Sequence, residues 1–595
     1  MTFPAAEPVS ASRRGHDLSD PTGKLSLVSP QWRLAPSDPA PTRRLAREAG
    51  LSDLVAHLLW RRGVANAEGA RLFLNPRGGP LHDPSLLLGA EEAADLLVSA
   101  ARSGKRIVVF GDYDVDGVTA VAQLRAALRR IGGDSAAFIP HRLRDGYGLK
   151  PGTVKRVLQE LSPAVIVTVD CGITAVEGVA CARAAGVDVV VTDHHLVPDA
   201  LPAGAIVVNP RQPGCRYPDK ELAASAIALK IAESVARRAA VTLSRESLLR
   251  AACLGTIADL VPLTGENRAI AAMGLAALAS CRAPGLRALL AEAGVAPGAA
   301  PTAEEVAFRI APRLNAAGRL DTAELALTLF EERDAARASR VARELSARNA
   351  ERQSLERRVV SEASERLEKD PEAGAAALIV EADSGWHRGV LGIAASRLAR
   401  EYHRPVLLFG LDGDKASGSG RSIPGVSLYG ILKELADHFI DFGGHDQAVG
   451  ATLSLTRFKT FRAEARALFA ERVPAETLTR FEEAESELPI EMISEGLPGE
   501  LSRLEPHGAG NPRPVFLARA VRSSGALLPV GERGLRGRLR RARGEIRCIA
   551  WQPGPALGSL AADGGPFDIH YRLAPDRGFG PEVEIIAARP AGDAP

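Results

Sequence analysis

The sequence predicts a multidomain α/β protein whose first domain is built on a parallel sheet. The chain has 595 residues, which is more than a single hydrophobic core usually supports. Between residues 107 and 208, short β-branched and apolar runs alternate with helical periodicity, a pattern typical of a parallel sheet with crossover helices. A second alternation of this kind begins near residue 373, and short β-like segments follow from about residue 497.

The composition indicates a globular protein of a reducing compartment. Hydrophobic residues make up 46% of the chain and charged residues 25%, and the net charge is only +2, so any nucleic-acid surface must come from local clustering. The six cysteines show no Cys-x-x-Cys spacing, which indicates free thiols rather than disulfides or a zinc site. No apolar signal segment or tract long enough to span a bilayer is present. We therefore expect a cytoplasmic protein without a membrane partner.

Five apolar runs of the first domain have the length and composition of buried strands. They are Ile107–Phe110, Ala136–Ile139, Val165–Val169, Asp188–Val191 and Ala205–Val208. Helical periodicity follows in a helix from Val118, in Thr153–Leu161 and Ala175–Ala185, and in a helical stretch from Ala224 through Leu254. Leu45 to Leu74 also has helical periodicity and is interpreted as an N-terminal extension of this domain.

Three carboxylates follow the first predicted strand on alternate residues. Asp112, Asp114 and Asp116 come directly after Phe110 and are expected in the turn before the helix from Val118. Crowded carboxylates repel one another, and a divalent cation reverses the sign of that interaction. Carboxylates without nearby thiolates suit a hard cation such as Mg²⁺ or Mn²⁺. An acidic surface turn would be the ordinary interpretation of one such motif on its own.

Acidic residues and histidines also follow two other predicted strands. Asp170 follows the third strand, and Asp193, His194 and His195 follow the fourth. Because ligands bind at the carboxyl ends of strands in open parallel sheets, these residues should converge with the first acidic cluster. His194 is therefore predicted to be a metal ligand, which a neighbouring acid can orient through the second ring nitrogen. Asp259 lies in apolar sequence and either caps a helix or joins the cluster.

Arginines among small and apolar residues indicate phosphate recognition at two places. Arg309, Arg313 and Arg319 lie in one such stretch. In the second α/β region, residues 416–422 are predicted to form a small-residue loop that bears Arg421, and residues 442–445 a glycine-bearing turn. Glycine lets backbone N–H groups approach an anion, although each loop on its own is equally typical of a flexible turn. Between these regions, residues 331–369 predict a long, charge-rich helix that connects two domains through solvent.

The C-terminal region predicts a small β-barrel that binds single-stranded nucleic acid. The tract from Arg533 to Arg547 contains arginines that alternate with glycine, leucine or alanine, so a strand would carry them on one face. Such a face fits a barrel that tracks a single strand. The alternative is a solvated edge hairpin.

Together these stretches resemble the DHH phosphoesterase superfamily, and within it the RecJ family of single-strand exonucleases. The matching segments are residues 111–117, 169–172, 192–195, 255–262, 311–319, 385–389, 417–422 and 443–445, and residues 504–516 resemble the start of the family's C-terminal OB domain. The resemblance covers nearly all of the chain from about residue 30. Residues 223–226 and Val449 depart from the family's pattern, and neither position is a metal ligand.

The resemblance implies a role for each matching residue. The implied metal ligands are Asp114, Asp116, Asp170, His194 and Asp259, and the catalytic group around them is Asp112, Asp193 and His195. Asp193 and His195 would orient the ligands or contact the scissile phosphate. Arg142, Ser419 and Arg421 would anchor phosphate, and Arg313, Asn315 and Arg319 would support the site or contact DNA. The glycine-bearing turn adds His445, and the alternating basic tract adds Arg536 and Arg538, as further predicted DNA contacts.

The implied function is that of a 5′-to-3′ exonuclease that degrades single-stranded DNA to mononucleotides in DNA repair and recombination. It would use two Mn²⁺ or Mg²⁺ ions and act as a monomer, with a helicase and a single-strand-binding protein as further candidate partners. One alternative is a DHH-type phosphodiesterase for short or cyclic oligonucleotides, although such relatives lack a basic barrel. Another is a non-catalytic replication scaffold, although such a protein would have lost the motif acids.

The resemblance also implies a division of the α/β chain into domains. Residues 1–30 are expected to be disordered, and the remaining segments are a DHH catalytic domain with an N-terminal helical extension (31–330), a connecting helix (331–370), a second α/β, DHH-associated domain (371–470), a linker (471–496) and an OB-like nucleic-acid-binding barrel (497–595).

Overall fold

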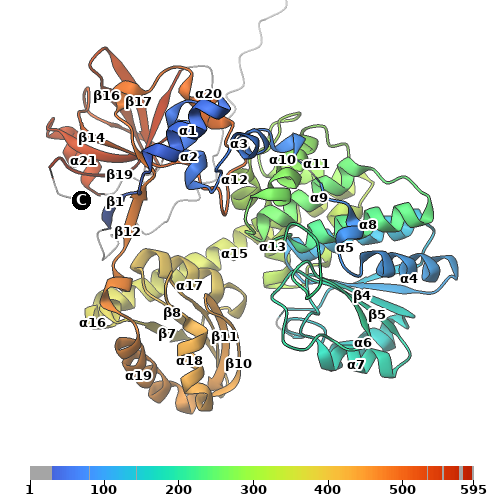
Figure 1. Cartoon of the computed structure of the whole chain (residues 1–595). Helices are drawn as coiled ribbons and strands as arrows, with labels where there is room; N and C mark the ends of the chain where they lie inside the picture. The colour runs from blue at the N-terminus through green and yellow to red at the C-terminus, as the bar shows by residue number, and fades with distance from the viewer. Residues whose placement is uncertain are drawn as a thin grey trace, which may run out of the picture.

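The computed structural model of the chain describes residues 30–79, 81–142, 144–531, 534–551, 555–574 and 580–592. The predicted disorder of residues 1–30 falls almost wholly outside the described residues, as does Arg533 of the basic tract. Figure 1 shows a parallel-sheet domain, a second α/β domain and a β-rich domain grouped around a long helix. Short 3₁₀ turns join several elements, at Pro76–Gly78, Pro84–Leu86, Lys433–His438, Ala475–Leu478 and Ile490–Met492.

The first domain contains the predicted parallel sheet, with strand order β3-β2-β4-β5-β6. The strands are β2 (Ile107–Phe110), β3 (Ser135–Phe138), β4 (Val165–Val169), β5 (Asp188–Thr192) and β6 (Ala205–Val208). Helices α4 (Ala90–Arg102), α5 (Val115–Arg130) and α8 (Ala224–Ala239) cover one face, and α6 (Pro151–Leu161) and α7 (Val176–Ala184) cover the other (Figure 1). Because both faces are covered, β2 and β4 are buried along their whole length. The chain reverses direction across the sheet between β2 and β4, and this switch point is where such sheets bind ligands.

A helical layer extends the core of this domain. It contains α9 (Arg245–Ala258), α10 (Gly265–Ala279), α11 (Pro284–Glu292), α12 (Ala303–Glu305), the π-helical segment Val306–Ile310, α13 (Ala311–Leu320) and α14 (Glu324–Glu331). The helical stretch expected from Ala224 through Leu254 is two helices. α8 ends before Ala240, which has φ +56°, and Ser244 caps the start of α9 through the backbone N–H of Ser247.

The connecting helix is confirmed as α15 (Ala335–Lys369), a single helix of 35 residues. It is not only a solvated connector, because its apolar residues are buried in two cores. Ala342 and Leu345 pack in the core of the first domain, and Val360 and Leu367 pack in the core of the second. The mixed charges of the sequence hid this apolar stripe, since most of the helix surface is polar. α15 therefore fixes the two α/β domains to one rigid element.

The second domain is a mixed sheet with strand order β10-β11-β9-β8-β7. Its strands are β7 (Ile379–Asp383), β8 (Val406–Asp412), β9 (Lys415–Arg421), β10 (Phe439–His445) and β11 (Ala448–Ser454). Its helices are α16 (Pro371–Ala375), α17 (Arg388–Tyr402), α18 (Leu428–Leu432) and α19 (Leu455–Arg472).

Two predictions for this domain were wrong, because residues 416–421 form most of strand β9 and residues 442–445 end strand β10. The glycines of β9 serve packing rather than flexibility. A Cβ on Gly418 would lie 2.4 Å from Cδ1 of Phe409, and one on Gly420 would lie 2.5 Å from Cδ2 of Leu407. The sequence Gly-Ser-Gly therefore buries one face of the strand tightly and leaves Ser419 and Arg421 on the other face.

The C-terminal domain is a sheet with strand order β13-β14-β18-β19-β17-β16-β15. Its elements are β13 (Ser486–Glu487), α20 (Leu497–Ser502), β14 (Phe516–Val521), β15 (Leu528–Val530), β16 (Gly534–Arg540), β17 (Glu545–Ala550), α21 (Pro555–Ala562), β18 (Phe567–Leu573) and β19 (Glu582–Pro590). Arg536, Arg538 and Arg540 are exposed on β16, and they alternate with Gly537 and the buried Leu539. The predicted one-sided row of arginines is present.

The N-terminal helices pack on the C-terminal barrel rather than on the parallel sheet. These are α1 (Pro39–Ala49), α2 (Asp53–Arg61) and α3 (Ala67–Leu74), preceded by β1 (Gln31–Leu34), which pairs with β12 (Phe481–Ala484). Leu45 and Leu58 share one hydrophobic core with Phe516 and Phe567 of the barrel, and α1 and α2 lie beside it in Figure 1. Helical periodicity identified the helices but not their partner. Residues 471–496, expected to be a linker, also supply strands β12 and β13.

The barrel is fixed to the first domain beside the loop that follows α9. The buried Arg268 of α10 donates hydrogen bonds to the backbone carbonyls of Phe73, Leu504, Glu505 and Pro506. The backbone N–H of Leu263 donates to the carbonyl of Ala509 at 2.7 Å.

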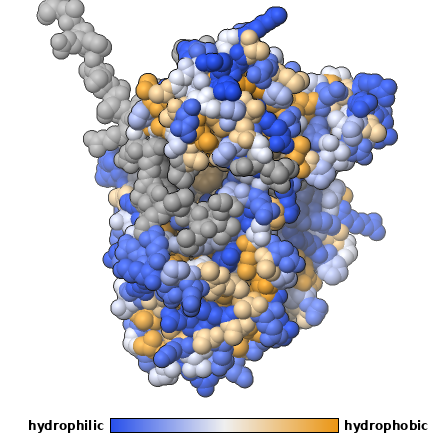
Figure 2. Space-filling model, turned by 90° about the vertical axis from the view of Figure 1, so that its left-hand side faces the viewer, coloured by the Kyte–Doolittle hydropathy of each residue, from blue (hydrophilic) through white to orange (hydrophobic). Residues whose placement is uncertain are grey.

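No single helix among the described residues is long and apolar enough to cross a membrane. The helix pair Gly265–Ala279 and Pro284–Glu292 is together long and apolar enough to cross a membrane. The pair is bent by 92°, however, and most of its apolar side chains lie in the core. Apolar residues are scattered over the face shown in Figure 2, which is mostly hydrophilic.

Because the core is shared, we expect a substitution in α2 to destabilise the barrel. Leu58 is fully buried, so Leu58→Ala should lower the free energy of unfolding of this unit by about 2–5 kcal/mol. Pulsed thiol labelling with peptide mapping should then show faster labelling of the buried Cys548 of β17, and unchanged labelling of Cys253 in the first domain. Leu124→Ala in α5 is the matched control, and it should speed the labelling of Cys253 and leave that of Cys548 unchanged. Faster labelling of Cys253 alone in Leu58→Ala would contradict the shared core.

Candidate metal centre

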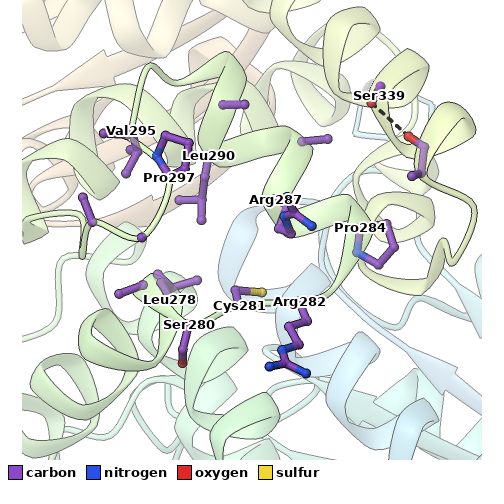
Figure 3. A pocket seen from close by; sticks show the side chains of 17 residues that line it. Leu278, Ser280, Cys281, Arg282, Pro284, Arg287, Leu290, Val295, Pro297 and Ser339 are labelled. Atoms are coloured by element: carbon purple, nitrogen blue, oxygen red, sulfur yellow. Dashed lines mark hydrogen bonds between the residues drawn. The ribbon is translucent and has the colours of Figure 1, made fainter.

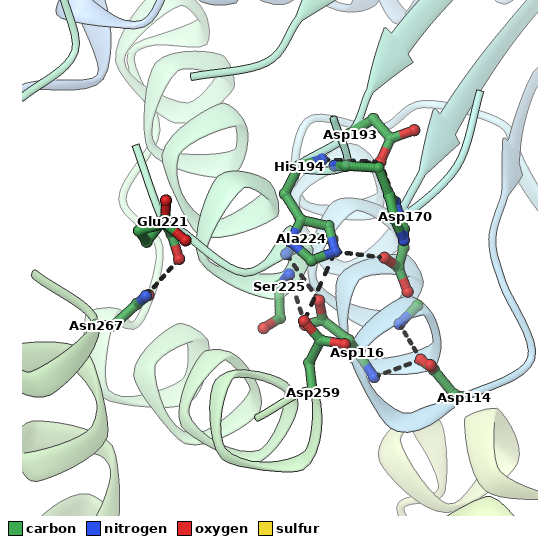
Figure 4. Close-up of polar contacts among 12 residues, drawn as sticks. Asp114, Asp116, Asp170, Asp193, His194, Glu221, Ala224, Ser225, Asp259 and Asn267 are labelled. Carbon is green, nitrogen blue, oxygen red and sulfur yellow. Dashed lines mark hydrogen bonds and ion pairs between the residues drawn. The ribbon is translucent and has the colours of Figure 1, made fainter. Parts of the chain in front are cut away.

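Carboxylates and histidines from separate elements converge at the switch point of the parallel sheet (Figure 4). Asp112 and Asp114 follow β2, Asp170 follows β4, Asp193, His194 and His195 follow β5, and Asp259 ends α9. Three groups among them place one ligand atom per residue within 4.8 Å of one another. The groups are Asp170 with His194 and His195, Asp116 with His194 and Asp259, and Asp112 with Asp114 and Asp170. The predicted convergence is present.

The start of α5 holds two of these acids through its backbone. Asp114 is the N-cap of α5, and its Oδ1 accepts hydrogen bonds from the backbone N–H groups of Asp116 at 3.0 Å and Gly117 at 3.1 Å. The sequence predicted Asp116 in the turn before the helix, but it lies in the first turn of the helix itself. The helix begins at Val115 rather than Val118 because this cap forms. The backbone N–H of Val115 donates to Oδ1 of Asn315 on α13 at 3.0 Å, which fixes the turn from a second side.

Asp116 is buried, and the N-terminus of α8 holds it. Its Oδ2 accepts from the N–H of Ala224 at 2.7 Å, and its Oδ1 accepts from the N–H of Ser225 at 2.9 Å. Free N–H groups at a helix start favour a negative charge. A Cβ on Gly255 of α9 would lie 2.4 Å from Oδ1 of Asp116 and 2.3 Å from Oγ of Ser225. Glycine at position 255 therefore lets α9 approach and bring Asp259 to the cluster.

His194 lies between acids of two elements. Its Nε2 is 3.2 Å from Oδ1 of Asp170 and 3.7 Å from Oδ2 of Asp259. This Nε2 atom and Oδ1 of Asp112 are buried without a hydrogen-bond partner among the described residues. Buried polar atoms are costly without a partner, so these atoms fit an inner coordination site.

The backbone of Asp170 adopts an unusual conformation that places its side chain in the cluster. Its φ is +62°, and that of Gly172 is +111°. Tyr147 donates from its hydroxyl to the carbonyl of Asp170 at 3.0 Å, which holds this turn. Left-handed backbone in a residue other than glycine is typical of functional sites.

Asp193 organises the turn after β5 rather than facing the other acids. Its Oδ2 accepts from the N–H of Ile173 at 2.9 Å, and its Oδ1 accepts from the N–H of His194 at 2.8 Å and contacts Nδ1 of His195 at 2.7 Å. Both carboxylate oxygens are therefore engaged, which fits the orienting role among the alternatives for this residue. Burial lowers the pKa of His195, but the hydrogen bond and charge of Asp193 outweigh it and raise the pKa to about 9. His195 is thus a half-exposed cation at the mouth of the cluster.

Burial and mutual repulsion make the acids reluctant to ionise together. Burial, and then the charge of Asp114, raise the pKa values of Asp112 and Asp170 well above the ordinary range. The same two causes raise the pKa of Asp116 to about 6, and burial with the charge of Asp116 raises that of Asp259 to about 8. Burial and the charge of His195 lower the pKa of His194 to about 4, which keeps it neutral and able to bind a metal. The donor set of carboxylates and a neutral imidazole fits hard or borderline divalent cations.

A group of arginines lies next to the acids, between the two α/β domains. Burial, and then repulsion by Arg142, Arg352 and Arg421, lower the pKa of Arg319 to about 9. Burial, Arg421 and, more weakly, His195 lower the pKa of His445, so these groups lie near one another where the two α/β domains meet. An anion would relieve the repulsion among these cations.

Packing around this group fixes its cations from both domains. The guanidinium of Arg142 lies 4.8 Å over the ring of Tyr113, and that of Arg421 lies against Gly392, where a Cβ would be 2.9 Å from it. Ser419 lies on the same face of β9 as Arg421, two residues before it. The junction of the two α/β domains therefore combines an acidic cluster with a group of arginines.

Not every predicted site residue lies beside the acids. Arg313 donates to the carbonyls of Arg309 and Glu292 and to Oγ of Ser346, so it fastens α13 to its neighbours. Arg536 and Arg538 lie on the barrel, apart from the acids. Arg352 was missed at the sequence level, because it is one of many arginines in α15 and only the fold buries it beside Arg319.

A separate cavity of about 570 Å³ lies between the end of α10, α11 and the start of α15 (Figure 3). It is lined by Leu278, Cys281, Arg287, Pro297 and Ser339, among others. It contains none of the converging acids, so it is not part of the candidate centre.

Known proteins match the chain over most of its length. Family models match residues 106–256 (DHH family, N-terminal domain), 374–471 (DHHA1 domain) and 484–578 (RecJ OB domain). The single-stranded-DNA-specific exonuclease RecJ of Dickeya dadantii is 35% identical over 568 residues, which are 91% of this chain and 94% of that protein. RecJ of Bacillus subtilis is 35% identical over 88% of this chain, which spans 66% of that protein's length.

Two crystal structures of RecJ from Thermus thermophilus have the same fold. The structure in complex with Mn²⁺ has a TM-score of 0.79 and 33% identity, and covers 94% of this chain and 79% of that chain. The structure in complex with Mg²⁺ has a TM-score of 0.73 and 32% identity, and covers 95% of this chain and 80% of that chain.

The close approach at Gly255 predicts an effect on metal affinity. Alanine in a helix interior is normally more stable than glycine. In Gly255→Ala, however, the new Cβ would displace Asp116 and Ser225, so affinity for Mn²⁺ should fall by at least about tenfold, as for other groups that hold metal ligands. Titration calorimetry with Mn²⁺ measures this affinity.

The matched control is Gly152→Ala in α6, where a Cβ has no neighbour within 4 Å. It should leave Mn²⁺ affinity unchanged and raise the free energy of unfolding by about 0.4–1 kcal/mol. Unchanged affinity in Gly255→Ala would show that Asp116 does not depend on the approach of α9.

Proposed function

The chain belongs to the RecJ family of single-stranded-DNA-specific exonucleases, and we propose that it hydrolyses single-stranded DNA from the 5′ end and releases mononucleotides. The observation that carries this proposal is the convergence of Asp114, Asp116, Asp170, His194 and Asp259 beside a group of arginines. The complete set of acids disfavours a non-catalytic scaffold. The C-terminal barrel with its row of arginines disfavours a phosphodiesterase that acts only on short or cyclic oligonucleotides.

Those five side chains would hold two Mn²⁺ or Mg²⁺ ions, and Asp112 lies beside Asp114 and Asp170 in the same cluster. When bound, such ions generate a nucleophilic hydroxide at neutral pH and neutralise charge that develops on the phosphate. The orphaned Nε2 of His194 and Oδ1 of Asp112, together with the raised pKa values of the acids, support this assignment. Asp114 and Asp116 are pre-oriented by backbone N–H groups, so little reorganisation is needed on binding.

The other residues of the domain junction would bind and align the substrate. Asp193 keeps His195 charged and oriented, so His195 can donate a hydrogen bond to a phosphate oxygen. Asn315 holds the turn that carries Asp114. No covalent intermediate is required, because the attacking group is water. The metal site itself does not distinguish the two strand directions, so polarity must come from elsewhere at the domain junction.

We assign the 5′ polarity to Arg142, Ser419 and Arg421. A terminal phosphate carries more charge than an internal one, and arginine matches it with paired donors. Repulsion among Arg142, Arg319 and Arg421 would be relieved by such an anion. The two domains would then hold the 5′ phosphate at a fixed place beyond the acids, while Arg319 and His445 line the path of the strand.

The cellular setting is a further part of the proposal. DNA repair and recombination produce single strands from duplex DNA, so a helicase and a single-strand-binding protein are the partners that this activity needs. The described cysteines form no disulfide, which supports action in the cytoplasm. We propose that the protein acts as a monomer, since one chain supplies both the acids and the arginines of the domain junction.

We expect that replacing one of the acids or His194 stops cleavage and leaves the fold intact. Asp170→Asn and His194→Ala should abolish cleavage of labelled single strands. Without metal, Asp170→Asn should also melt at a higher temperature than wild type, because one repelling charge is gone. Mn²⁺ should raise the melting temperature of wild type but not that of Asp170→Asn. Normal turnover of either variant at ordinary metal concentration would contradict the metal assignment.

Arg421→Ala predicts a change in end recognition. It should raise KM mainly for 5′-phosphorylated strands and remove their advantage over 5′-hydroxyl strands, while metal-dependent hydrolysis survives. Steady-state kinetics on both substrates at matched salt measure this, with the exposed Arg400→Ala of α17 as the control. If Arg421→Ala keeps the full preference for the 5′ phosphate, the anchor lies elsewhere.

The row of arginines on β16 predicts the salt dependence of binding. Replacing Arg536 and Arg538 with alanine should make the logarithmic dependence of single-strand affinity on salt shallower by about 0.7 for each lost phosphate contact. Point variants are preferable to deletion of residues 497–595, because deletion would expose the core shared with α1 and α2. An unchanged slope would mean that this row is only a solvated edge.

A further inference from the structure

The two most exposed large apolar side chains of the described residues both border the acid cluster. Leu196 is 73% exposed and directly follows His195, and Leu260 is 68% exposed and directly follows Asp259. Neither belongs to a hydrophobic cluster of the described residues. Single exposed leucines are common on protein surfaces. Two exposed leucines that each follow a residue of the same site, however, indicate that the site needs them.

The backbone of Leu260 shows that its side chain is retained at a cost. Asp259 is the C-cap of α9, and the next residue, Leu260, has φ +62°. This position after a helix is usually glycine or asparagine, because a bulky side chain is strained there. The exposed leucine gains nothing from packing within the chain. Ala240 after α8 has the same conformation, but its side chain is small, so the combination of a bulky side chain, exposure and left-handed backbone at Leu260 is what motivates the inference.

The geometry of the cluster brings together the two chain segments that carry these leucines. Nε2 of His194 lies 3.7 Å from Oδ2 of Asp259, so the turn after β5 and the loop after α9 approach one another at the cluster. Tyr147 is 41% exposed on the rim of the cluster, where its ring meets that of His195 edge-on at 5.9 Å and its hydroxyl holds Asp170. The rim around the acids and His195 thus carries three exposed side chains with apolar surface, Leu196, Leu260 and Tyr147.

We propose that Leu196 and Leu260 are specificity-determining residues that contact the base and sugar of the nucleotide next to the scissile phosphate. This inference rests on the proposed nuclease function of the same site. Leucine offers no hydrogen bond, so it cannot hold a phosphate, and the apolar surfaces of a nucleotide are its base faces and its sugar. In a duplex the base faces are covered by stacking, so the rim would favour an unstacked, single-stranded end.

The test compares two 5′-phosphorylated single strands that differ only at the terminal nucleotides, where one strand has normal bases and the other has abasic tetrahydrofuran residues. Wild type should cleave the intact strand with a kcat/KM about tenfold higher, the effect of burying one or two aliphatic side chains. Leu260→Asn, which suits the left-handed backbone, and Leu196→Ala should lower kcat/KM on the intact strand and leave the abasic strand nearly unchanged. Leu260→Met should retain the preference, because it keeps the apolar surface.

Two controls separate this role from a structural one. Leu260→Asn should melt at the same temperature as wild type or higher, since strain is removed, and it should keep wild-type Mn²⁺ affinity. Met492→Ala removes an equally exposed apolar side chain (67%) away from the cluster and should leave both strands unaffected.

An undiminished preference for the intact strand in both leucine variants would overturn the inference, and so would an equal loss on both strands. If wild type cleaves neither strand with Mn²⁺ or Mg²⁺, the proposed function itself fails.

Discussion

Repulsion among buried carboxylates is the constraint on which this structure depends. Acids that follow β2 and β4 and that end α9 meet at the switch point of the parallel sheet, where burial raises the pKa values of Asp112, Asp170 and Asp259. The fold holds them in place with backbone donors: α5 supports Asp114, and the start of α8 supports Asp116. A cation reverses the sign of the repulsion, so the same arrangement that strains the free protein gives the site its affinity.

A second group of like charges complements the first. Arg142, Arg319 and Arg421 come from both α/β domains and face the acidic cluster. Close backbone packing brings them together: a Cβ on Gly389 of α17 would lie 2.1 Å from the carbonyl oxygen of Arg319, and one on Gly318 would lie 2.4 Å from that of Tyr113. Each group alone is unfavourable. A divalent cation and a phosphate would satisfy both, which is why we propose that a nucleic-acid end binds between them.

The sequence predicted the parts of the fold and site that depend on local pattern. The five strands of the first sheet were found because each is a short apolar run, and the acids followed because they stand at strand ends. The alternating arginines of β16 were visible for the same reason. Asp116 was placed in a turn because residue spacing does not show that Asp114 caps the helix. Residues 416–422 were interpreted as a loop because glycine is rare in strands unless another surface approaches closely, and only the fold reveals Phe409 and Leu407 there.

Local sequence patterns could not predict packing between segments that lie far apart in the sequence. The periodicity of α1 and α2 identified apolar faces but could not show that the barrel, near the other end of the chain, covers them. The buried Arg352 has the same sequence context as its exposed neighbours in α15.

The position of Mn²⁺ in crystals of the protein, measured by anomalous scattering at the manganese edge, is the most direct test of the metal centre. We expect two anomalous peaks within the cluster bounded by Asp114, Asp116, Asp170, His194 and Asp259. Both peaks should vanish in crystals of Asp170→Asn grown under the same conditions. Peaks elsewhere in the molecule, with none among these side chains, would contradict this metal assignment.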